Sequence, residues 1–288
     1  MVEYSNPIPP DHMNRGKDSG LRDLMLLGIG GLGLLVAVMF GLMLLGGAVG
    51  RMIPFSYELA VVEHFAPQAV TRPDSGRALE LQELADRLAR HMRLPEDMRI
   101  TVHYDNDPQV NAFATVGGQV IILGGLLSNV KSENELAMVM AHEIAHIKNR
   151  DVAANLFGAA IMALFYTAFF GGEGVSTDIF QGAGGLLRLG FSREAERQAD
   201  ADALRALVRE YGHANGAVDL FETLDAANIE AGGGLLNDFE MLRTHPSIDK
   251  RIAAVKELAN ELEAPLEGPL APLSNTLGSA PSLGKSAK

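Results

Sequence analysis

The hydrophobic and polar positions along the chain divide it into five parts. An uncharged, mostly apolar run fills residues 24–50 and is long enough to cross a bilayer core of about 30 Å as a helix. The polar residues 1–23 before it are expected to be disordered. After it, the pattern predicts a linker over 51–74 and a folded domain over 75–262. Residues 263–288 are rich in Pro, Ser, Gly and Leu, and we expect a disordered tail there.

The apolar run at residues 24–50 is predicted to be a transmembrane helix and not a cleaved signal peptide. The apolar part of a signal peptide is about 7–15 residues long, and this run is far longer. Arg15, Lys17 and Arg22 precede the run, and Arg51 follows it closely. Because basic residues favour the cytoplasmic side, we expect a cytoplasmic N-terminus. The chain would then be a single-pass protein of the bacterial inner membrane, with its domain facing the periplasm.

Two glycine patterns lie within the apolar run. Residues 28–33 match G-x-G-x-x-G, but no strand precedes them, so we do not expect a dinucleotide site. Gly46 and Gly50 form G-x-x-x-G, a pattern that can bring two membrane helices together.

Within the domain, the pattern predicts mainly helices with a small sheet. Apolar residues at helical spacing predict a helix over 75–92, and alternation predicts strands at 99–104 and 119–123. The segment 111–116 is the candidate for an exposed sheet edge, to which an extended peptide can add as a further strand. An ordinary hairpin with one buried face is the alternative. The candidate substrate-contacting residues are Asn111, Ala112, Phe113 and Ala114.

A helix that carries the sequence H-E-x-x-H is predicted in the middle of the domain. Ser132 and Glu135 are typical of a capping box at its start. His142 and His146 are four residues apart, so both imidazoles lie on one helical face and can reach a single metal ion. Glu143 is rotated by about 100° from its neighbour. This rotation places it beside the metal, where a general base belongs.

A third metal ligand is expected from a second helix downstream. Catalytic zinc sites of this type use two His and one Glu and leave a fourth position for water. Glu196 and Asp200 lie four residues apart in a stretch that we predict to be helical. Glu194 is a rival for the third ligand, because only one of two residues at this spacing can face the metal.

Four short motifs occur in an order that a known family also has. They are Asn111-Ala112-Phe113-Ala114 with Gly117-Gly118, the H-E-x-x-H helix, the stretch from Ser192 to Asp200, and Thr244-His245-Pro246. Together they resemble the membrane-associated gluzincins, metallopeptidase family forty-eight, which includes HtpX and the CAAX prenyl proteases. The resemblance covers roughly residues 75 to 260.

The resemblance implies a role for each matching residue. It implies His142, His146 and Glu196 as the ligands of one zinc ion per chain, and Glu143 as the catalytic base. Asp200 would be a carboxylate that orients a ligand histidine, as such ligands usually require. A solvated carboxylate on a helix face is the alternative for Asp200. The fold class expected is α+β, a mostly helical metalloprotease domain with a small sheet beside the H-E-x-x-H helix.

His245 is a further candidate for catalysis, just before a helix predicted from about residue 248 to 262. An imidazolium there could stabilise the oxyanion of the tetrahedral intermediate, or the imidazole could occupy the fourth zinc position in a resting state. A loop histidine without a catalytic role is the alternative.

A second apolar stretch, residues 152–170, is long enough to cross the membrane again. His146 and Glu196 must bind one ion on one side of the membrane, so the number of crossings between them must be even. Residues 171–190 are too polar and glycine-rich to return. We therefore expect a buried helix or one in the membrane interface, unlike relatives that have two extra spans here.

The amino-acid composition limits the classes of binding partner that we expect. The net charge of -12 and the lack of a basic cluster argue against nucleic acid. Cysteine is absent, so nitrogen and oxygen atoms must hold any metal. The expected partners are polypeptide substrates, which the resemblance suggests are misfolded or damaged envelope proteins.

The predicted function is a membrane-anchored zinc metalloendopeptidase in envelope protein quality control. Water activated by zinc would attack the peptide bond, with Glu143 taking its proton and returning it to the leaving amine. Two other classes remain. One is an autoinhibited or non-cleaving binding or chaperone-like module that keeps the zinc site, and the other is a zinc hydrolase of a non-peptide bond. Prenyl-protein processing is less expected, because those relatives have many spans and this chain has one clear anchor.

Overall fold

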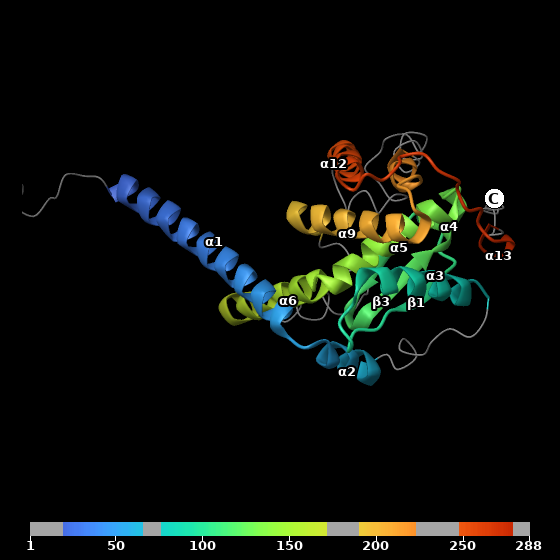
Figure 1. The fold of residues 1–288 in the computed structure, drawn as a ribbon. Coiled ribbons are helices and arrows are strands. Elements are labelled where there is room, and N and C mark those ends of the chain that lie inside the picture. The colour runs from blue at the N-terminus through green and yellow to red at the C-terminus, as the bar shows by residue number, and fades with distance from the viewer. Residues whose placement is uncertain (1–19, 66–75, 172–189, 223–247, 279–288) are drawn as a thin grey trace, which may run out of the picture.

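The computed structural model describes residues 20–65, 76–171, 190–222 and 248–278. Helices dominate this part of the chain, and a small three-stranded sheet lies among them (Figure 1). The expected α+β class with an N-terminal apolar helix is therefore confirmed. The helices are α1 (Gly20–Met52), α2 (Phe55–Phe65), α3 (Gly76–Met92), α4 (Gly124–Asn129), α5 (Glu133–Lys148), α6 (Asp151–Phe170), α9 (Arg193–Tyr211), α12 (Ile248–Glu261) and α13 (Asn275–Gly278). The strands are β1 (Thr101–Asp105), β2 (Ala112–Thr115) and β3 (Gln119–Leu123), and the short 3-10 turn η3 is Val116–Gly118.

Helix α1 extends away from the rest of the molecule, and α6 packs against the end of α1 nearest the domain (Figure 1). A Cβ atom added to Gly46 would lie 2.8 Å from the Cα atom of Gly158. One added to Gly50 would lie 2.5 Å from the carbonyl oxygen of Ala153. Only small residues permit such an approach. The G-x-x-x-G pattern therefore pairs two helices of the same chain.

Both α1 and α6 are long and apolar enough to cross a membrane, as the lengths of the two apolar stretches predicted. The side chains of Leu164 and Phe169, in the outer half of α6, are each 70% exposed. The expectation of a buried helix is therefore wrong for this half, because α6 packs on α1 mainly through its first half. The exposed apolar side chains favour the membrane interface, the other expected location.

The sheet has the strand order β1-β3-β2. Strand β1 runs parallel to β3, and β2 runs antiparallel to β3 with Ala112 opposite Ile122. The turn between β2 and β3 requires a left-handed backbone at Gly117 (φ 70°), which glycine adopts without steric cost. Strand β2 has one strand neighbour among the described residues, so it is an edge strand. It also forms a hairpin with β3, and its side chains alternate between buried and partly buried.

Helix α5 lies at the centre of the domain and packs against α3, α9 and β2. Every residue from 134 to 147 is buried. The polar side chains of this helix are therefore held inside the protein. A helix enclosed in this way keeps its side chains in fixed positions.

The start of α5 has the predicted cap. The hydroxyl oxygen of Ser132 accepts a hydrogen bond from the amide of Glu135 at 3.2 Å. The carboxylate of Glu135 accepts one from the amide of Lys131 at 3.1 Å. In a standard capping box this carboxylate would accept from the amide of the N-cap residue, Ser132, instead. Both hydrogen bonds satisfy backbone donors at the helix start.

Residues 264–278 lie against the domain, although we expected disorder from residue 263 onward. The amide of Glu133 donates to the carbonyl of Ala271 at 2.9 Å, and the amide of Ala271 donates to the side chain of Asn134 at 2.8 Å. Leu277 is buried. The amino-acid composition of this segment did not predict that it packs on the domain. The segment is held by hydrogen bonds of its backbone to the start of α5, and composition does not indicate such bonds.

The expected linker at 51–74 contains helix α2. Phe55 and Val62 are buried on its inner side, and the helix packs against η3. A helix of only three turns has too few apolar positions for their spacing to distinguish it from a linker in the sequence.

Candidate metal centre

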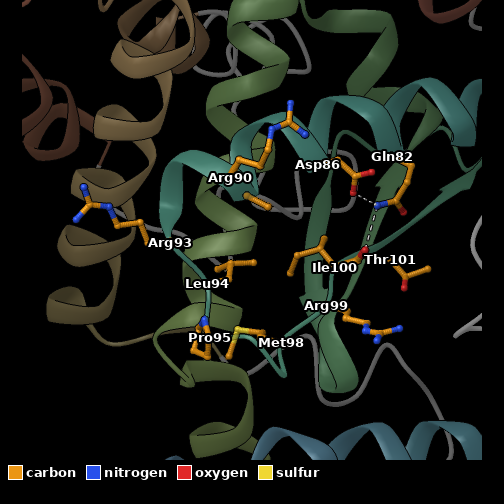
Figure 2. Close-up of a pocket in the computed structure, with 11 residues that line it drawn as sticks. Gln82, Asp86, Arg90, Arg93, Leu94, Pro95, Met98, Arg99, Ile100 and Thr101 are labelled. Carbon is orange, nitrogen blue, oxygen red and sulfur yellow. Dashed lines mark hydrogen bonds between the residues drawn. The ribbon is translucent and has the colours of Figure 1, made fainter.

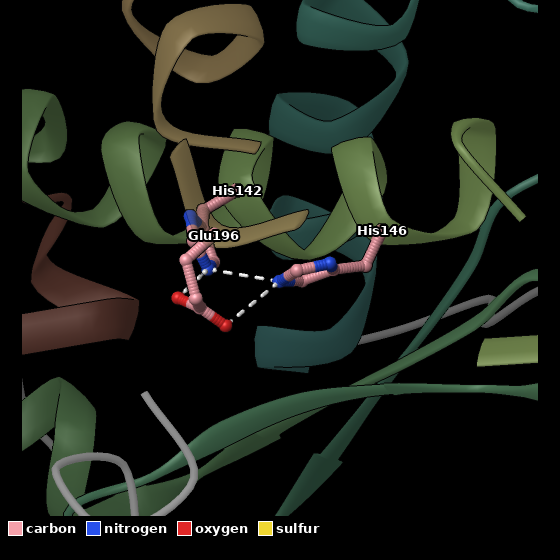
Figure 3. Close-up of side chains that lie close together, drawn as sticks. All are labelled: His142, His146 and Glu196. Carbon is pink, nitrogen blue, oxygen red and sulfur yellow. Dashed lines mark hydrogen bonds and ion pairs between the residues drawn. The ribbon is translucent and has the colours of Figure 1, made fainter. Parts of the chain in front are cut away.

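Three side chains from two helices converge inside the domain (Figure 3). His142 and His146 lie one turn apart on α5, and Glu196 comes from the first turn of α9. The Nε2 atoms of the two histidines are 3.1 Å apart. The carboxylate oxygens of Glu196 lie 3.5 Å from His142 Nε2 and 3.6 Å from His146 Nε2. The structure thus brings together three residues that the sequence singled out as ligands.

The chemistry and spacing of these donor atoms fit one zinc ion. All three donor atoms lie within 4.8 Å of one another. With zinc–nitrogen distances of about 2.0–2.1 Å, tetrahedral ligand atoms are about 3.3 Å apart, close to the separations seen here. The rival Glu194 lies outside this cluster. Its side chain is 77% exposed and forms an ion pair with Arg197 at the surface.

Asp200 contacts the other ring nitrogen of His142. Its Oδ1 atom is 2.9 Å from His142 Nδ1, the arrangement that fixes the tautomer and orientation of a ligand histidine. Burial would raise the pKa of the Asp200 carboxyl, but hydrogen bonds from His142 and Arg251 lower it to about 2. Asp200 is therefore buried against His142, and the solvated alternative does not hold. Its role in orienting a metal ligand stays a prediction.

Arg251, on α12, is a mostly buried cation beside the cluster, with its side chain 11% exposed. Its Nε and a terminal nitrogen donate to the two oxygens of Asp200 at 2.8 and 2.6 Å. Its other terminal nitrogen is 3.5 Å from the Glu196 carboxylate. A guanidinium in this position partly neutralises two buried carboxylates and fixes Asp200 in a bidentate pair.

The ring of His146 is held on a different side. Its Nδ1 atom is 3.1 Å from Oδ2 of Asp151, the first residue of α6. The ring of Phe191 stacks on the imidazole with centroids 3.8 Å apart. Each histidine of the cluster therefore has its own buried carboxylate, Asp200 for His142 and Asp151 for His146.

Glu143 faces the edge strand. Its Oε2 atom accepts a hydrogen bond from the backbone amide of Ala114 at 2.8 Å, and its side chain is buried. Ala114 pairs with Val120 in the ladder, yet its N–H group points away from β3 toward α5. The candidate base and the outer edge of β2 are therefore in direct contact.

The two edges of the sheet differ in what covers them. Along β1, the side chain of Gln82 accepts from the amide of Val102 at 2.8 Å and donates to the carbonyl of Ile100 at 3.0 Å. Figure 2 shows this glutamine at a cavity of about 670 Å³ between α3 and the start of β1. No residue that lines the cavity belongs to the metal cluster. The outer edge of β1 is thus partly capped, whereas β2 runs past Glu143.

Two residues around the centre were not identified from the sequence, and one candidate lies outside the described residues. Asp151 could have been found from the need of His146 for a carboxylate partner. Arg251 had no such signal, because nothing in its local sequence indicates burial beside Asp200. His245 falls in the segment 223–247 that the structure does not describe, so its proposed roles stay predictions.

Metal affinity is expected to rise with pH up to about pH 9. Burial and Arg251 lower the pKa of His142, but hydrogen bonds with Asp200 and Glu196 outweigh them and raise it to about 9. At pH 7 the metal must then displace a proton from the ring. The apparent zinc affinity should increase about tenfold per pH unit between pH 7 and 9. Competition with a chromophoric chelator measures it, and an affinity that is constant over this range would contradict the prediction.

The variant Asp151→Asn is expected to weaken zinc binding by about 10- to 100-fold. An amide is a weaker acceptor than a carboxylate, so the His146 ring is less well oriented and less basic. Zinc titration of the metal-free full-length chain measures the change. The variant Asp97→Asn, at an exposed position, is the control and should bind zinc like the wild type. Equal zinc affinity of both variants would show that Asp151 does not contribute to the metal centre.

Comparison with known proteins identifies a family model that covers most of the domain. The model described as "Peptidase family M48" matches residues 75–259, well over half of the chain. A protease HtpX homologue of Salinibacter ruber is 31% identical over an alignment of 231 residues, and the match covers 70% of this chain and 82% of that protein. An HtpX homologue of Gemmatimonas aurantiaca is 30% identical over an alignment of 234 residues, and the match covers 69% of this chain and 81% of that protein.

A mitochondrial relative shares a smaller part. The mitochondrial metalloendopeptidase OMA1 of Schizosaccharomyces pombe is 33% identical over 177 residues. The aligned part is 59% of this chain and 50% of the yeast protein. The chain thus spans half the length of that relative.

Proposed function

The chain belongs to peptidase family M48, and on that basis we propose that it is a membrane-anchored zinc metalloendopeptidase. The family and the relatives support a metal-dependent protease, and the long apolar helices support its association with a membrane. The finer proposal is that zinc is the metal, with one ion per chain, and that Glu143 is the general base.

One observation carries the proposal. Two imidazole nitrogens and a carboxylate converge within 4.8 Å, and a further carboxylate, that of Glu143, lies next to them on α5 without belonging to the donor set. Three protein ligands with a neighbouring base are the components of a hydrolytic zinc site. His142, His146 and Glu196 would hold the ion.

Each side chain of the site has a separate role in the proposed hydrolysis. A zinc ion held here would supply hydroxide at neutral pH and polarise the scissile carbonyl. Glu143 would take the proton from the attacking water and deliver it to the leaving amine nitrogen. The amide of Ala114 fixes the direction of the Glu143 carboxylate. Asp200 and Asp151 orient the two imidazoles.

The peptide substrate is proposed to add as a strand to the outer edge of β2. That edge carries the amide of Ala114, which reaches Glu143, so a peptide aligned on β2 would pass the candidate base. Main-chain hydrogen bonds tolerate many side chains, which suits misfolded or damaged envelope proteins as substrates. The proposed edge residues are Asn111, Ala112, Phe113 and Ala114.

The proposed location is the bacterial inner membrane. Helix α1 would be the anchor, with residues 1–23 in the cytoplasm and the peptidase domain, residues 75–262, in the periplasm. Helix α6 starts at Asp151 beside the metal centre and packs along α1. The centre would therefore lie close to the membrane surface, with the outer half of α6 in the interface.

Cleavage of casein by the full-length chain in detergent tests the proposed function. We expect cleavage to stop when 1,10-phenanthroline removes the metal and to return when zinc is restored. Cleavage that persists without metal would overturn the proposal. A chain that holds one zinc ion yet cuts nothing would instead favour the tethered binding module.

A further inference from the structure

Residues 51–62, which we call the junction segment, connect the membrane helix to the domain. They include the end of α1 and the first two turns of α2. They lie before residue 75, where the family match begins, and the sequence predicted only a linker there. In the structure they contact the end of the metal-binding helix and the turn that follows the substrate edge.

The first contact is at the end of the metal-binding helix. Arg150 joins α5 to α6 with a left-handed backbone, φ 64°, which is unfavourable for a residue with a Cβ atom. Its guanidinium donates to the carbonyl of Ile53 and pairs with the carboxylate of Glu58. The next residue, Asp151, contacts His146. The junction segment therefore holds the connection that places Asp151 against the metal ligand.

The second contact is at the turn after β2. The other oxygen of Glu58 accepts a hydrogen bond from the amide of Gly117 at 3.1 Å. A Cβ atom on Gly117 would lie 2.7 Å from Cγ2 of Val62, and one on Gly118 would lie 3.0 Å from the ring of Phe55. Helix α2 and the turn are thus in close contact, and Glu58 is 7% exposed between them.

We propose that the junction segment is part of the active site and that Glu58 is a positioning residue for the edge strand. One carboxylate oxygen of Glu58 binds Arg150, which follows α5, the helix that carries the candidate ligands. The other oxygen binds the amide of Gly117, which follows β2, the strand whose Ala114 contacts Glu143. A buried carboxylate with a cation on one side and an N–H group on the other fixes the spacing of the two elements. This inference rests on the proposed function, because β2 is taken to bind the peptide.

The variant Glu58→Gln tests the positioning role. Its side chain has one acceptor oxygen and one NH₂ group, so it cannot satisfy both Arg150 and Gly117. For the full-length chain in detergent, we expect KM for a casein-derived peptide to rise at least tenfold and kcat to change less than threefold, with one zinc ion retained. Hydrogen exchange of the amides of residues 112–118 should accelerate at least tenfold. The matched control is Glu63→Gln, exposed on the same helix, which should match the wild type.

Each outcome of this experiment decides the proposal. Equal KM and equal exchange for Glu58→Gln and Glu63→Gln would overturn it. If the wild type shows no metal-dependent cleavage, the proposed function fails, and the exchange of residues 112–118 still decides the positioning role. If Glu58→Gln does not fold, Glu58→Asp replaces it, because it keeps the charge but is one methylene too short to bridge both partners. An unchanged KM in Glu58→Asp would then overturn the proposal.

Discussion

Replacement of Glu143 by Gln is expected to slow peptide hydrolysis by about 10²- to 10⁴-fold, the range typical of a lost general base, with the metal still bound. Glu143 is not one of the three converging donors, so its loss leaves the ligand set complete. A glutamine can still accept the hydrogen bond from the Ala114 amide, but it cannot take a proton from water. The rate of casein cleavage and the zinc content of the same sample measure the two effects.

The control for this variant is Glu194→Gln. Glu194 is exposed at the start of α9 and outside the metal cluster, so its replacement should change neither the rate nor the zinc content. Loss of zinc in Glu143→Gln would show that Glu143 is a ligand and that the base is misassigned. An unchanged rate would show that another group moves the proton.

Replacement of His146 by Ala is expected to remove the metal. The ring is fully buried and supplies one of three donors, so two donors and an open cavity would remain. The variant also leaves Asp151 without its imidazole partner, and truncation of a buried side chain of this size costs about 2–5 kcal/mol. Zinc content after dialysis should fall well below one equivalent, and the thermal unfolding temperature of the metal-free chain should drop.

His103→Ala provides the comparison for the histidine variant. His103 lies on β1, where its Nε2 atom is 2.7 Å from the side chain of Gln119, outside the metal cluster. We expect this variant to keep its zinc and its activity. A stable His146→Ala protein with one full equivalent of zinc would contradict the proposed ligand set.

The local parts of the candidate site could be predicted from the sequence. The spacing of His142 and His146 determines that both rings share one helix face, and the cap at Ser132 marks where that helix begins. The rotation of Glu143 away from the two rings follows from helix geometry. These features depend on residues a few positions apart, so the chain pattern contains them.

The surroundings of the site could not be predicted in this way. Arg251 lies 51 residues from Asp200, and Glu58 lies 59 residues from Gly117. Their roles come from tertiary contacts, and a charged residue on a helix is usually solvated. The docked segment 264–278 was missed for the same reason. Periodicity indicates which face is apolar but does not identify the surface that covers it.

The contacts of the junction segment determine which form of the chain is suitable for kinetic tests. The family match begins at residue 75, and a protein truncated there would lose Ile53 and Glu58. Arg150 would then lose the carbonyl and the carboxylate that hold its left-handed backbone. We therefore expect the full-length chain in detergent to be the proper form for every kinetic test.

The most direct test of a peptidase with one metal ion per chain is a titration of the metal-free, full-length chain with zinc while casein cleavage is followed. The expected result is no cleavage without metal, and a rate that rises linearly to one equivalent of zinc per chain and then stays level. Cleavage by the metal-free chain, or a rate that needs two equivalents, would contradict a single centre built from His142, His146 and Glu196.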